Sequence, residues 1–263
     1  MTGKVSIVGA GPGAADLLTV RAAEALRSAD VVLHDDLVSA EVLALCPPRA
    51  QIVNAGKRCG RQGSSQEEIN QQMVDYALRG LAVVRLKSGD PSVYGRLGEE
   101  LDALREAGIS FHVIPGVTAA SAAAAAAEIT LTDRRKASAL VVLTGHNADD
   151  EIRQHATLDP ERTTYAVYMP GPDYARTARE LVNLGIDPAT PCALVSHAGR
   201  STQQVRFLSI EGLGSARGII PPAVLIVGRV AQRNEFSEIL KSLAGNTEAV
   251  PFEPIDDLSM PRL

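Results

Sequence analysis

Polar and glycine-rich segments follow several apolar runs of this chain, and they carry the side chains best suited to chemistry. Asp35 and Asp36 come directly after the apolar run 31–34, and Ser88-Gly89-Asp90-Pro91 follows the β-branched run 81–86. Apolar runs that stop at Gly, Asp and Pro are typical of buried strands. Ligands bind beyond the carboxyl ends of strands in open α/β sheets, so both segments indicate a crevice at one edge of a sheet.

The two adjacent acids receive different interpretations. Two adjacent acids at the carboxyl end of a buried strand are well placed for chemistry, and Asp35 is kept as a candidate for it. For Asp36 we favour a side chain that faces water, next to a short helix at 41–45 that Ser39 caps.

A glycine-rich segment at residues 55–63 carries three positive charges and no acid, supplied by Lys57, Arg58 and Arg61. A charge run of this kind is usually a solvated face of a protein. In a chain of net negative charge, three cations on a glycine-rich loop also suit a clamp for a polycarboxylate or a phosphate.

Composition excludes several classes of protein. The 263 residues include 26 basic and 31 acidic side chains, a net charge of -5, which argues against nucleic acid or an anionic membrane as the main partner. Three cysteines without a Cys-x-x-Cys pair predict a reduced protein with no disulfide framework or zinc knuckle. No apolar run approaches the roughly 20 residues that span a bilayer, and no signal peptide precedes the first apolar run. We therefore expect a soluble, cytoplasmic protein.

The apolar runs predict an α/β fold made of two α/β halves with a site in the cleft between them. The first sheet should be mostly parallel and the second mixed, because the runs 192–196 and 205–209 leave no room for a crossover helix. The expected domains are residues 1–114 and 115–245, followed by a tail at 246–263. The other predicted strands cover residues 5–8, 31–34, 51–54, 81–86, 111–114, 139–144, 164–169 and 223–227.

Helical patterns separate these strands. Ser65 to Glu68 fits a capping box and opens a helix that Gly80 ends. Further helices are predicted at 97–107 and 174–184. An alanine-rich helix should follow Thr118, and its first backbone amides are available as hydrogen-bond donors.

The turn Gly9-Ala10-Gly11-Pro12-Gly13-Ala14 comes close to a dinucleotide fingerprint, with a helical pattern after it and Asp30, Asp35 and Asp36 further on. In that fingerprint, amides at the start of the helix hold a pyrophosphate, and Pro12 removes one amide from this turn. A nicotinamide-dependent oxidoreductase is therefore the weaker of the readings that this turn allows.

Six motifs together resemble those of the tetrapyrrole methyltransferases, in the same order and over nearly the whole chain. The match is more specific than any one motif within it. Gly56-Lys57-Arg58 followed by Ser65-Gln66-Glu67-Glu68 is similar to the branch that methylates uroporphyrinogen III. The motifs are Gly9-Ala10-Gly11-Pro12-Gly13, His34-Asp35-Asp36-Leu37-Val38-Ser39, Gly56-Lys57-Arg58, Gly89-Asp90-Pro91 with Tyr94-Gly95-Arg96 and Glu99-Glu100, Pro115-Gly116-Val117-Thr118-Ala119-Ala120 and Thr144-Gly145-His146.

The resemblance implies transfer of methyl groups from S-adenosylmethionine to two pyrrole carbons, C-2 and C-7, of uroporphyrinogen III. The product would be precorrin-2, formed by way of precorrin-1 and used for siroheme or cobalamin, with S-adenosylhomocysteine as the second product. It also implies a homodimer. No metal is expected, because a sulfonium methyl is already activated. The chain starts at its first strand and stops soon after its last, so we expect a standalone enzyme without a fused dehydrogenase and ferrochelatase module.

The same resemblance implies roles for particular residues. Asp35 matches the position of the base that removes a proton, and Lys57 matches that of its acid partner. The alternative is electrostatic, with Asp35 stabilising a cationic intermediate and Lys57 binding a substrate carboxylate. Arg58, Arg61 and Arg96 are candidates for the acidic side chains of the substrate. Cofactor contacts are expected from Pro12, Ser88, Gly89, Asp90, Val93, Thr118, Ala119, Met169, Ala198 and Ala223.

The chain departs from the family pattern in four places. Ser88 replaces a usual glycine, which would cost conformational energy if that position needed a positive φ. His34 replaces a tyrosine and Leu97 a glycine, and Ser196-His197-Ala198-Gly199 differs from the common run there. These departures bear on the substrate and on the adenine end of the cofactor. A related precorrin C-methyltransferase is the main alternative, and a non-catalytic tetrapyrrole or cofactor carrier is more remote.

Overall fold

The computed structural model describes residues 2–56, 65–145 and 158–233. Its first half contains β1 (Val5–Gly9), α1 (Val20–Arg27), β2 (Val31–His34), α2 (Ala40–Leu43), β3 (Gln51–Asn54), α3 (Gln66–Leu78), β4 (Val83–Lys87), α4 (Leu97–Glu106) and β5 (Phe111–Ile114). Its second half contains α5 (Ala119–Ala126), β6 (Ala139–Thr144), β7 (Thr163–Tyr168), α6 (Tyr174–Asn183), β8 (Pro191–Ser196), β9 (Gln204–Ser209) and β10 (Ala223–Val227).

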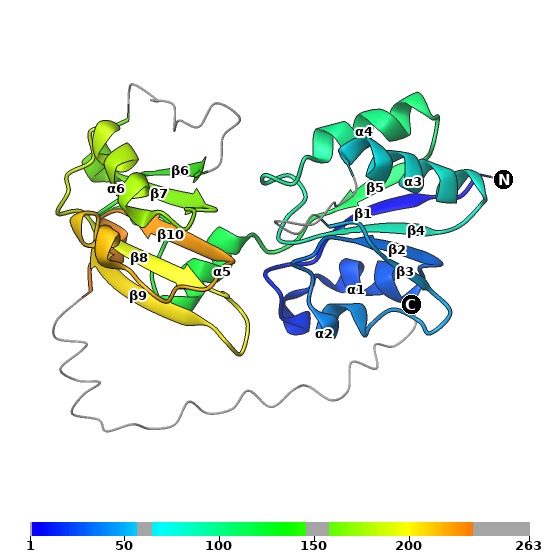
Figure 1. Cartoon of the computed structure of the whole chain (residues 1–263), viewed down its shortest axis with the longest axis horizontal. Helices are drawn as coiled ribbons and strands as arrows, with labels where there is room; N and C mark the ends of the chain where they lie inside the picture. Colours follow the sequence, from blue (N-terminus) through cyan, green and yellow to red (C-terminus); the bar gives the residue numbers. More distant parts are fainter. Residues whose placement is uncertain (1, 57–64, 146–157, 234–263) are drawn as a thin grey trace. The chain divides into compact units, whose positions relative to one another are not determined.

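The first half is a five-stranded parallel sheet in the order β3-β2-β4-β1-β5 (Figure 1). Alternate residues of each strand point to opposite faces, and both faces are apolar, as is usual for a parallel sheet covered by helices. Met73 of α3 and Leu104 of α4 are buried with Ile7 on one face. Leu26 of α1 and Val42 of α2 are buried with Val8 on the other face.

Strands β1 and β4 are neighbours, with Val8 opposite Leu86, but their connections leave toward opposite faces. Helix α1 follows β1 and packs on one face, whereas α4 follows β4 and packs on the other. This divergence opens a crevice beyond the carboxyl ends of the two strands, which is the usual ligand position in such a sheet. The glycine turn after β1 and the Ser88 to Pro91 loop after β4 both start there.

The second half is a mixed five-stranded sheet in the order β6-β7-β10-β8-β9 (Figure 1). β6 and β7 are parallel, while β7–β10, β10–β8 and β8–β9 are antiparallel pairs. Leu181 of α6 is buried on one face, and Ala123 of α5 packs with Ala193 and Ile226 on the other. The predicted α/β class, with a parallel first sheet and a mixed second one, is confirmed.

Both sheets belong to one compact unit, Met1–Ala231. The division into domains at residue 115 stays a prediction, and the expected tail at 246–263 lies outside the described residues. Among the helices of the described part, none is long and apolar enough to span a bilayer.

Local signals place the helix starts. Ser65 and Glu68 form the predicted capping box at the start of α3. Ser39 accepts a hydrogen bond from the amide of Val42 and caps α2, also as predicted. Helix α1 begins only at Val20, after the cap Thr19 and a short 3-10 turn at Ala15–Leu17. A dinucleotide-binding turn leads directly into a helix, whereas the glycine turn after β1 does not.

Three glycines bring the loops after β1, β4 and β5 into backbone contact. A Cβ on Gly9 would lie 2.6 Å from the amide nitrogen of Gly116, and one on Gly116 would lie 2.3 Å from the carbonyl oxygen of Gly89. Because these obstacles are backbone atoms, no rotamer change of a side chain relieves them. The three loops can approach this closely only if Gly9 and Gly116 lack a side chain.

Gly116→Ala should therefore lower the free energy of unfolding by about 1–3 kcal/mol through overpacking, measured by urea denaturation. The matched control is Gly98→Ala in α4, where a Cβ would meet no atom within 4 Å. That change should be neutral or raise the free energy of unfolding by up to about 1 kcal/mol. Equal effects of the two substitutions would contradict the close approach of the three loops.

Candidate functional site

A pocket of about 180 Å³ is lined by loops from both halves of the compact unit. The first half contributes the segments after β1, β2, β4 and β5, and the second half contributes segments after β7 and β8 and the start of β10. Most lining side chains are small or apolar, and Asp35, Asp90 and Arg200 are its charged members. The crevice expected from the sequence is thus a pocket with few and separate charges.

The structure brings together most of the predicted site. All ten residues expected to contact a cofactor line the pocket, and Asp35 lines it as well. Arg96 is not among the lining residues. Lys57, Arg58 and Arg61 lie outside the described residues. The cofactor residues in the lining are Pro12, Ser88, Gly89, Asp90, Val93, Thr118, Ala119, Met169, Ala198 and Ala223.

The loops after β1 and β4 are joined by two backbone hydrogen bonds. The amide of Gly89 donates to the carbonyl of Gly11 at 2.7 Å, and the amide of Gly11 donates to the carbonyl of Gly89 at 3.2 Å. Gly89 has a φ of +69°, a left-handed conformation that favours glycine. Ser88 is not among the residues with a positive φ. The departure from glycine at position 88 therefore carries no left-handed strain.

Asp90 connects its own loop to the loop after β5. One carboxylate oxygen accepts a hydrogen bond from the amide of Gly116 at 3.0 Å, and the other accepts from the amide of Ser92 at 2.8 Å and from the Ser92 hydroxyl. Partial burial raises the pKa of Asp90, but the hydrogen bonds from Ser92 and Gly116 outweigh it, so the pKa lies below its ordinary value. Asp90 is thus an ionised brace between two walls of the pocket.

The start of α5 forms another wall. Thr118 caps the helix, and its hydroxyl accepts a hydrogen bond from Tyr168 at 2.9 Å. The Tyr168 hydroxyl in turn accepts from the amide of Ala120 at 3.0 Å. The amide of Ala119 donates no hydrogen bond to any described residue. It lies next to Gly89, 3.9 Å from where a Cβ on that glycine would be. A free donor of the kind that the sequence predicted is therefore present.

Two tyrosines extend this wall. The rings of Tyr94 and Tyr168 lie 5.4 Å apart in a tilted arrangement, and the Tyr94 hydroxyl donates to the carbonyl of Val142 at 2.9 Å. Tyr94 and Met169 have φ angles of 53° and 48°. Non-glycine residues adopt this left-handed conformation rarely, and such residues cluster at functional sites.

Asp35 lies at the carboxyl end of β2, where its amide donates to the carbonyl of Leu86 at 3.1 Å. Its Oδ1 accepts a hydrogen bond from Nη2 of Arg85 at 2.5 Å. No described residue donates to its Oδ2, and the side chain is 29% exposed. One oxygen is therefore held in place while the other is available to a proton donor.

Asp36 corrects one expectation. It is half-buried rather than turned freely to water, because Asn54 at the end of β3 donates a hydrogen bond to its Oδ1 at 2.8 Å. Asp36 does not line the pocket. Asp35 lines the pocket and Asp36 does not, and the surroundings of Asp36 are set by the pairing of strands β2 and β3 rather than by solvation.

Arg96 is committed to a local ion pair. Its Nε and Nη2 donate to the two carboxylate oxygens of Glu99 at 2.7 and 2.6 Å, and both side chains are exposed. The hydrogen bonds that Arg96 donates to Glu99 raise the pKa of Arg96. A substrate carboxylate would have to compete with Glu99 for this guanidinium.

Sequence reasoning missed Arg200 and Arg85. Arg200 donates from Nε to the carbonyl of Pro12 at 3.2 Å and from Nη2 to the carbonyl of Leu37 at 2.6 Å. It therefore fastens a loop of the second half to two loops of the first. The sequence gives little indication of this role, because a single arginine in a polar loop is common. Arg85 had a clearer signal, because a charge within the apolar run 81–86 requires a buried partner.

A parallel sheet and a mixed sheet that share a pocket of glycine loops, small side chains and two carboxylates define a two-sheet α/β ligand-binding protein. Residues 4–214 match the family described as Tetrapyrrole (Corrin/Porphyrin) Methylases. The chain belongs to this family. The resemblance inferred from its motifs is confirmed.

Two curated relatives illustrate the similarity. Siroheme synthase 1 of Cronobacter sakazakii is 44% identical over 235 residues, which are 89% of this chain and 50% of that protein. Uroporphyrinogen-III C-methyltransferase of Paracoccus denitrificans is 41% identical over 238 residues, 89% of this chain and 83% of that protein. The chain thus spans about half the length of the siroheme synthases that it matches.

Solved structures share the fold over nearly the whole chain. A cobalt precorrin-4 methyltransferase matches with a TM-score of 0.78 and 30% identity, covering 88% of this chain and 96% of the other. Uroporphyrin-III C-methyltransferase of Thermus thermophilus, complexed with S-adenyl homocysteine, matches with a TM-score of 0.73 and 35% identity, covering 87% and 98%.

The brace formed by Asp90 predicts a pH-dependent contribution to stability. A group whose folded pKa is depressed stabilises the fold above its unfolded pKa, about 4 for aspartate, and loses this contribution as the pH falls through the folded value. Asp90→Asn should therefore lower the free energy of unfolding at pH 7, and the difference from wild type should shrink below about pH 4. Urea denaturation of both proteins across this range measures it, and a difference that grows on acidification would contradict the depressed pKa.

Proposed function

We propose that this chain is an S-adenosylmethionine-dependent C-methyltransferase that methylates uroporphyrinogen III at two pyrrole carbons to give precorrin-2 by way of precorrin-1. The observation that carries this proposal is the 41% identity to the uroporphyrinogen-III C-methyltransferase of Paracoccus denitrificans, of which the chain covers 83%. The siroheme synthases that match at about the same identity bear a name consistent with it.

The pocket suits the methyl donor. When bound, S-adenosylmethionine supplies a methyl group already activated by a sulfonium charge. The bare backbone of Gly89, the amide of Ala119 and the small side chains of Ala198 and Ala223 leave room and a donor for such a ligand. A related structure with 35% identity is a complex with S-adenyl homocysteine. The ten lining residues named above are the proposed contacts.

Asp35 is the proposed proton acceptor. Methylation of a pyrrole carbon leaves a cation on the substrate that must lose a proton. Oδ2 of Asp35 takes no hydrogen bond from any described residue, so its lone pairs are available for that proton, while Arg85 holds Oδ1. The electrostatic alternative, in which the carboxylate only stabilises the cation, uses the same geometry.

The remaining assignments rest on the family pattern. Lys57 is proposed as the acid partner of Asp35 or as a ligand for a substrate carboxylate, with Arg58, Arg61 and Arg96 binding the other acidic side chains. The homodimer is proposed on the same grounds. The proposed substrate carries several carboxylates, and positive side chains are the natural partners for them.

A related precorrin C-methyltransferase is the second candidate. It is favoured by the match to a cobalt precorrin-4 methyltransferase, whose TM-score of 0.78 exceeds the 0.73 of the Thermus thermophilus enzyme. Sequence identity orders the two the other way, at 30% and 35%. Because side chains rather than the fold choose the substrate, we give the identity more weight.

The test is anaerobic incubation with S-adenosylmethionine and uroporphyrinogen III, followed by mass spectrometry of the tetrapyrrole. We expect two successive methyl additions. Asp35→Asn should lower turnover by about 10²–10⁴-fold through loss of the proton acceptor. Asp16→Asn, which changes an exposed acid near the glycine turn, is the matched control and should leave turnover unchanged. Methylation of a later precorrin, with none of uroporphyrinogen III, would favour the second candidate. Full turnover by Asp35→Asn would remove Asp35 from both roles.

A further inference from the structure

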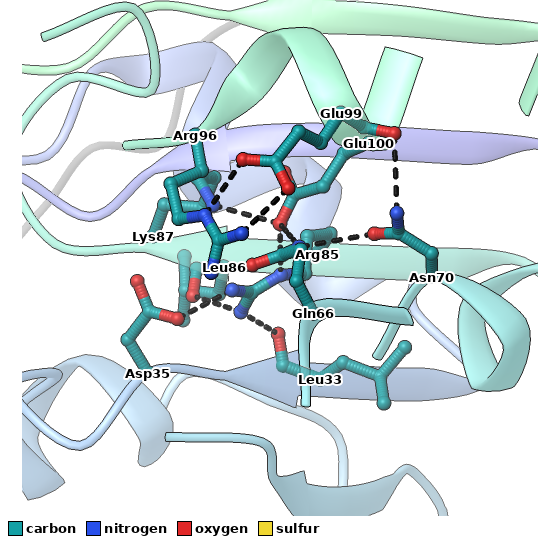
Figure 2. A network of polar contacts seen from close by, with 10 residues as sticks. All are labelled: Leu33, Asp35, Gln66, Asn70, Arg85, Leu86, Lys87, Arg96, Glu99 and Glu100. Atoms are coloured by element: carbon teal, nitrogen blue, oxygen red, sulfur yellow. Dashed lines mark hydrogen bonds and ion pairs between the residues drawn. The ribbon is translucent and has the colours of Figure 1, made fainter. Parts of the chain in front are cut away.

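Three buried charged side chains that do not line the pocket form a polar network with Asp35 (Figure 2). Arg85 and Lys87 of β4 are 2% and 3% exposed, and Glu100 of α4 is fully buried. Arg85 and Lys87 are two residues apart, so they lie on the same face of β4, which is the face that α4 covers. Together with Asp35 they form a cluster of two cations and two anions.

Glu100 is the common acceptor of this cluster. Its Oε1 accepts hydrogen bonds from Nε of Arg85 at 2.8 Å and from Nζ of Lys87 at 2.7 Å. The opposite end of the Arg85 guanidinium donates from Nη2 to Asp35. Its Nη1 donates to the backbone carbonyls of Leu33 and Leu86, both at 3.3 Å. Hydrogen bonds thus hold the planar guanidinium on every edge. Because Glu100 holds Arg85 and Arg85 holds Asp35, the position of Glu100 affects the orientation of the Asp35 carboxylate (Figure 2).

Stability does not explain such a cluster. Burying charges costs solvation energy, and well-packed apolar side chains in the same place are often as stable or more so. The Oε2 atom of Glu100 is buried without a hydrogen-bond partner in the described part of the chain, which adds to that cost. A costly polar cluster that ends on the carboxylate at the pocket indicates a role in presenting that carboxylate.

The pKa shifts of Arg85 and Lys87 indicate that the cluster acts through fixed charges and not as a path for protons. Burial lowers the pKa of Arg85, but the charges of Asp35 and Glu100 outweigh it, so that its pKa lies above the ordinary value. An arginine that stays charged cannot accept a proton from Asp35. Burial and the Arg85 charge lower the pKa of Lys87, and Glu100 offsets only part of this. Arg85 therefore offers no proton path from Asp35 into the buried cluster.

We propose that Glu100 is a positioning residue for the reaction: through Arg85 it fixes the orientation of the Asp35 carboxylate at the pocket. The proposal rests on the proposed methyl transfer for its consequence in turnover, but its geometry can be measured without catalysis. Glu100 acts through another residue and does not line the pocket.

Two variants separate positioning from stability. Glu100→Gln removes the negative charge and leaves two buried cations opposed by Asp35 alone, so it should lower both turnover and stability. The double variant Glu100→Leu with Lys87→Met replaces one buried ion pair with apolar side chains and keeps the Arg85–Asp35 pair neutral. It should recover the stability of wild type, because the buried charges are balanced again. Asp102→Asn, an exposed carboxylate of α4 paired with Arg105, is the matched control.

The kinetic readout is the anaerobic methylation assay, with S-adenosylhomocysteine affinity measured by calorimetry and stability by thermal unfolding. We expect both variants to lower kcat by about 10- to 100-fold, since misplacement of a reacting group by about 1 Å has an effect of this size. S-adenosylhomocysteine affinity should stay at the wild-type value. Recovery of kcat together with stability in the double variant would show that Glu100 is only structural. A parallel loss of affinity and kcat would show that it supports the loops instead.

The activity-independent readout is the carboxyl carbon resonance of Asp35, observed by NMR in protein labelled at aspartate and assigned by its loss in Asp35→Asn. We expect Glu100→Gln to move this resonance and Asp102→Asn to leave it in place. An unmoved resonance would overturn the positioning role whatever the kinetics. A moved resonance in a protein that methylates no tetrapyrrole would instead mean that the proposed function is wrong and the positioning geometry is right.

Discussion

The close approach of three backbone segments at Gly9, Gly89 and Gly116 is the constraint on which the pocket depends. These segments leave the parallel sheet at the adjacent strands β1, β4 and β5, and two of them exchange hydrogen bonds directly. With no side chain between them, the loops turn their amides and carbonyls toward one another. The left-handed Gly89 then leaves the amide of Ala119 near an open space rather than behind a Cβ. Part of the pocket wall is therefore backbone, and the nearby carboxylate of Asp90 joins two of these loops.

Much of this architecture follows from local sequence patterns. The apolar runs located the strands, and the short link between 192–196 and 205–209 predicted the antiparallel pair β8–β9. The observed strand ends differ from the predicted ones where a neighbouring element uses the same backbone hydrogen-bonding groups. β4 begins at Val83 because the amide of Leu81 is used by the closing turn of α3, where it donates to Tyr76. The order of strands within each sheet did not follow, because pairing between distant segments is not encoded in the period of either one. The placement of Pro12, Asp90 and Thr118 around one pocket came from the family resemblance, and local patterns alone would not have joined them.

The parts that the sequence did not reveal are those whose meaning depends on a distant partner. Arg85 reads as an irregularity in an apolar run until Glu100 and Asp35 are found at its two ends. Arg200 reads as a loop residue until its guanidinium is found between the carbonyls of Pro12 and Leu37. In both cases an arginine joins elements far apart in the chain, using donors that point in fixed directions. For Asp36 the sequence predicted a side chain that faces water, and this was wrong. The side chain instead accepts a hydrogen bond from Asn54, which depends on the pairing of strands β2 and β3.

Tyr94 and Met169 line the pocket in left-handed conformations that non-glycine residues adopt at a cost of about 1–2 kcal/mol each. Glycine at either position would remove that cost, so the chain carries strain at its binding site that a simple exchange would relieve. What glycine lacks is the ring of Tyr94 against Tyr168 and the side chain of Met169 at the pocket wall. The pocket is therefore a place where thermostability and ligand recognition are in opposition, and a variant selected only for heat resistance would be expected to change there first.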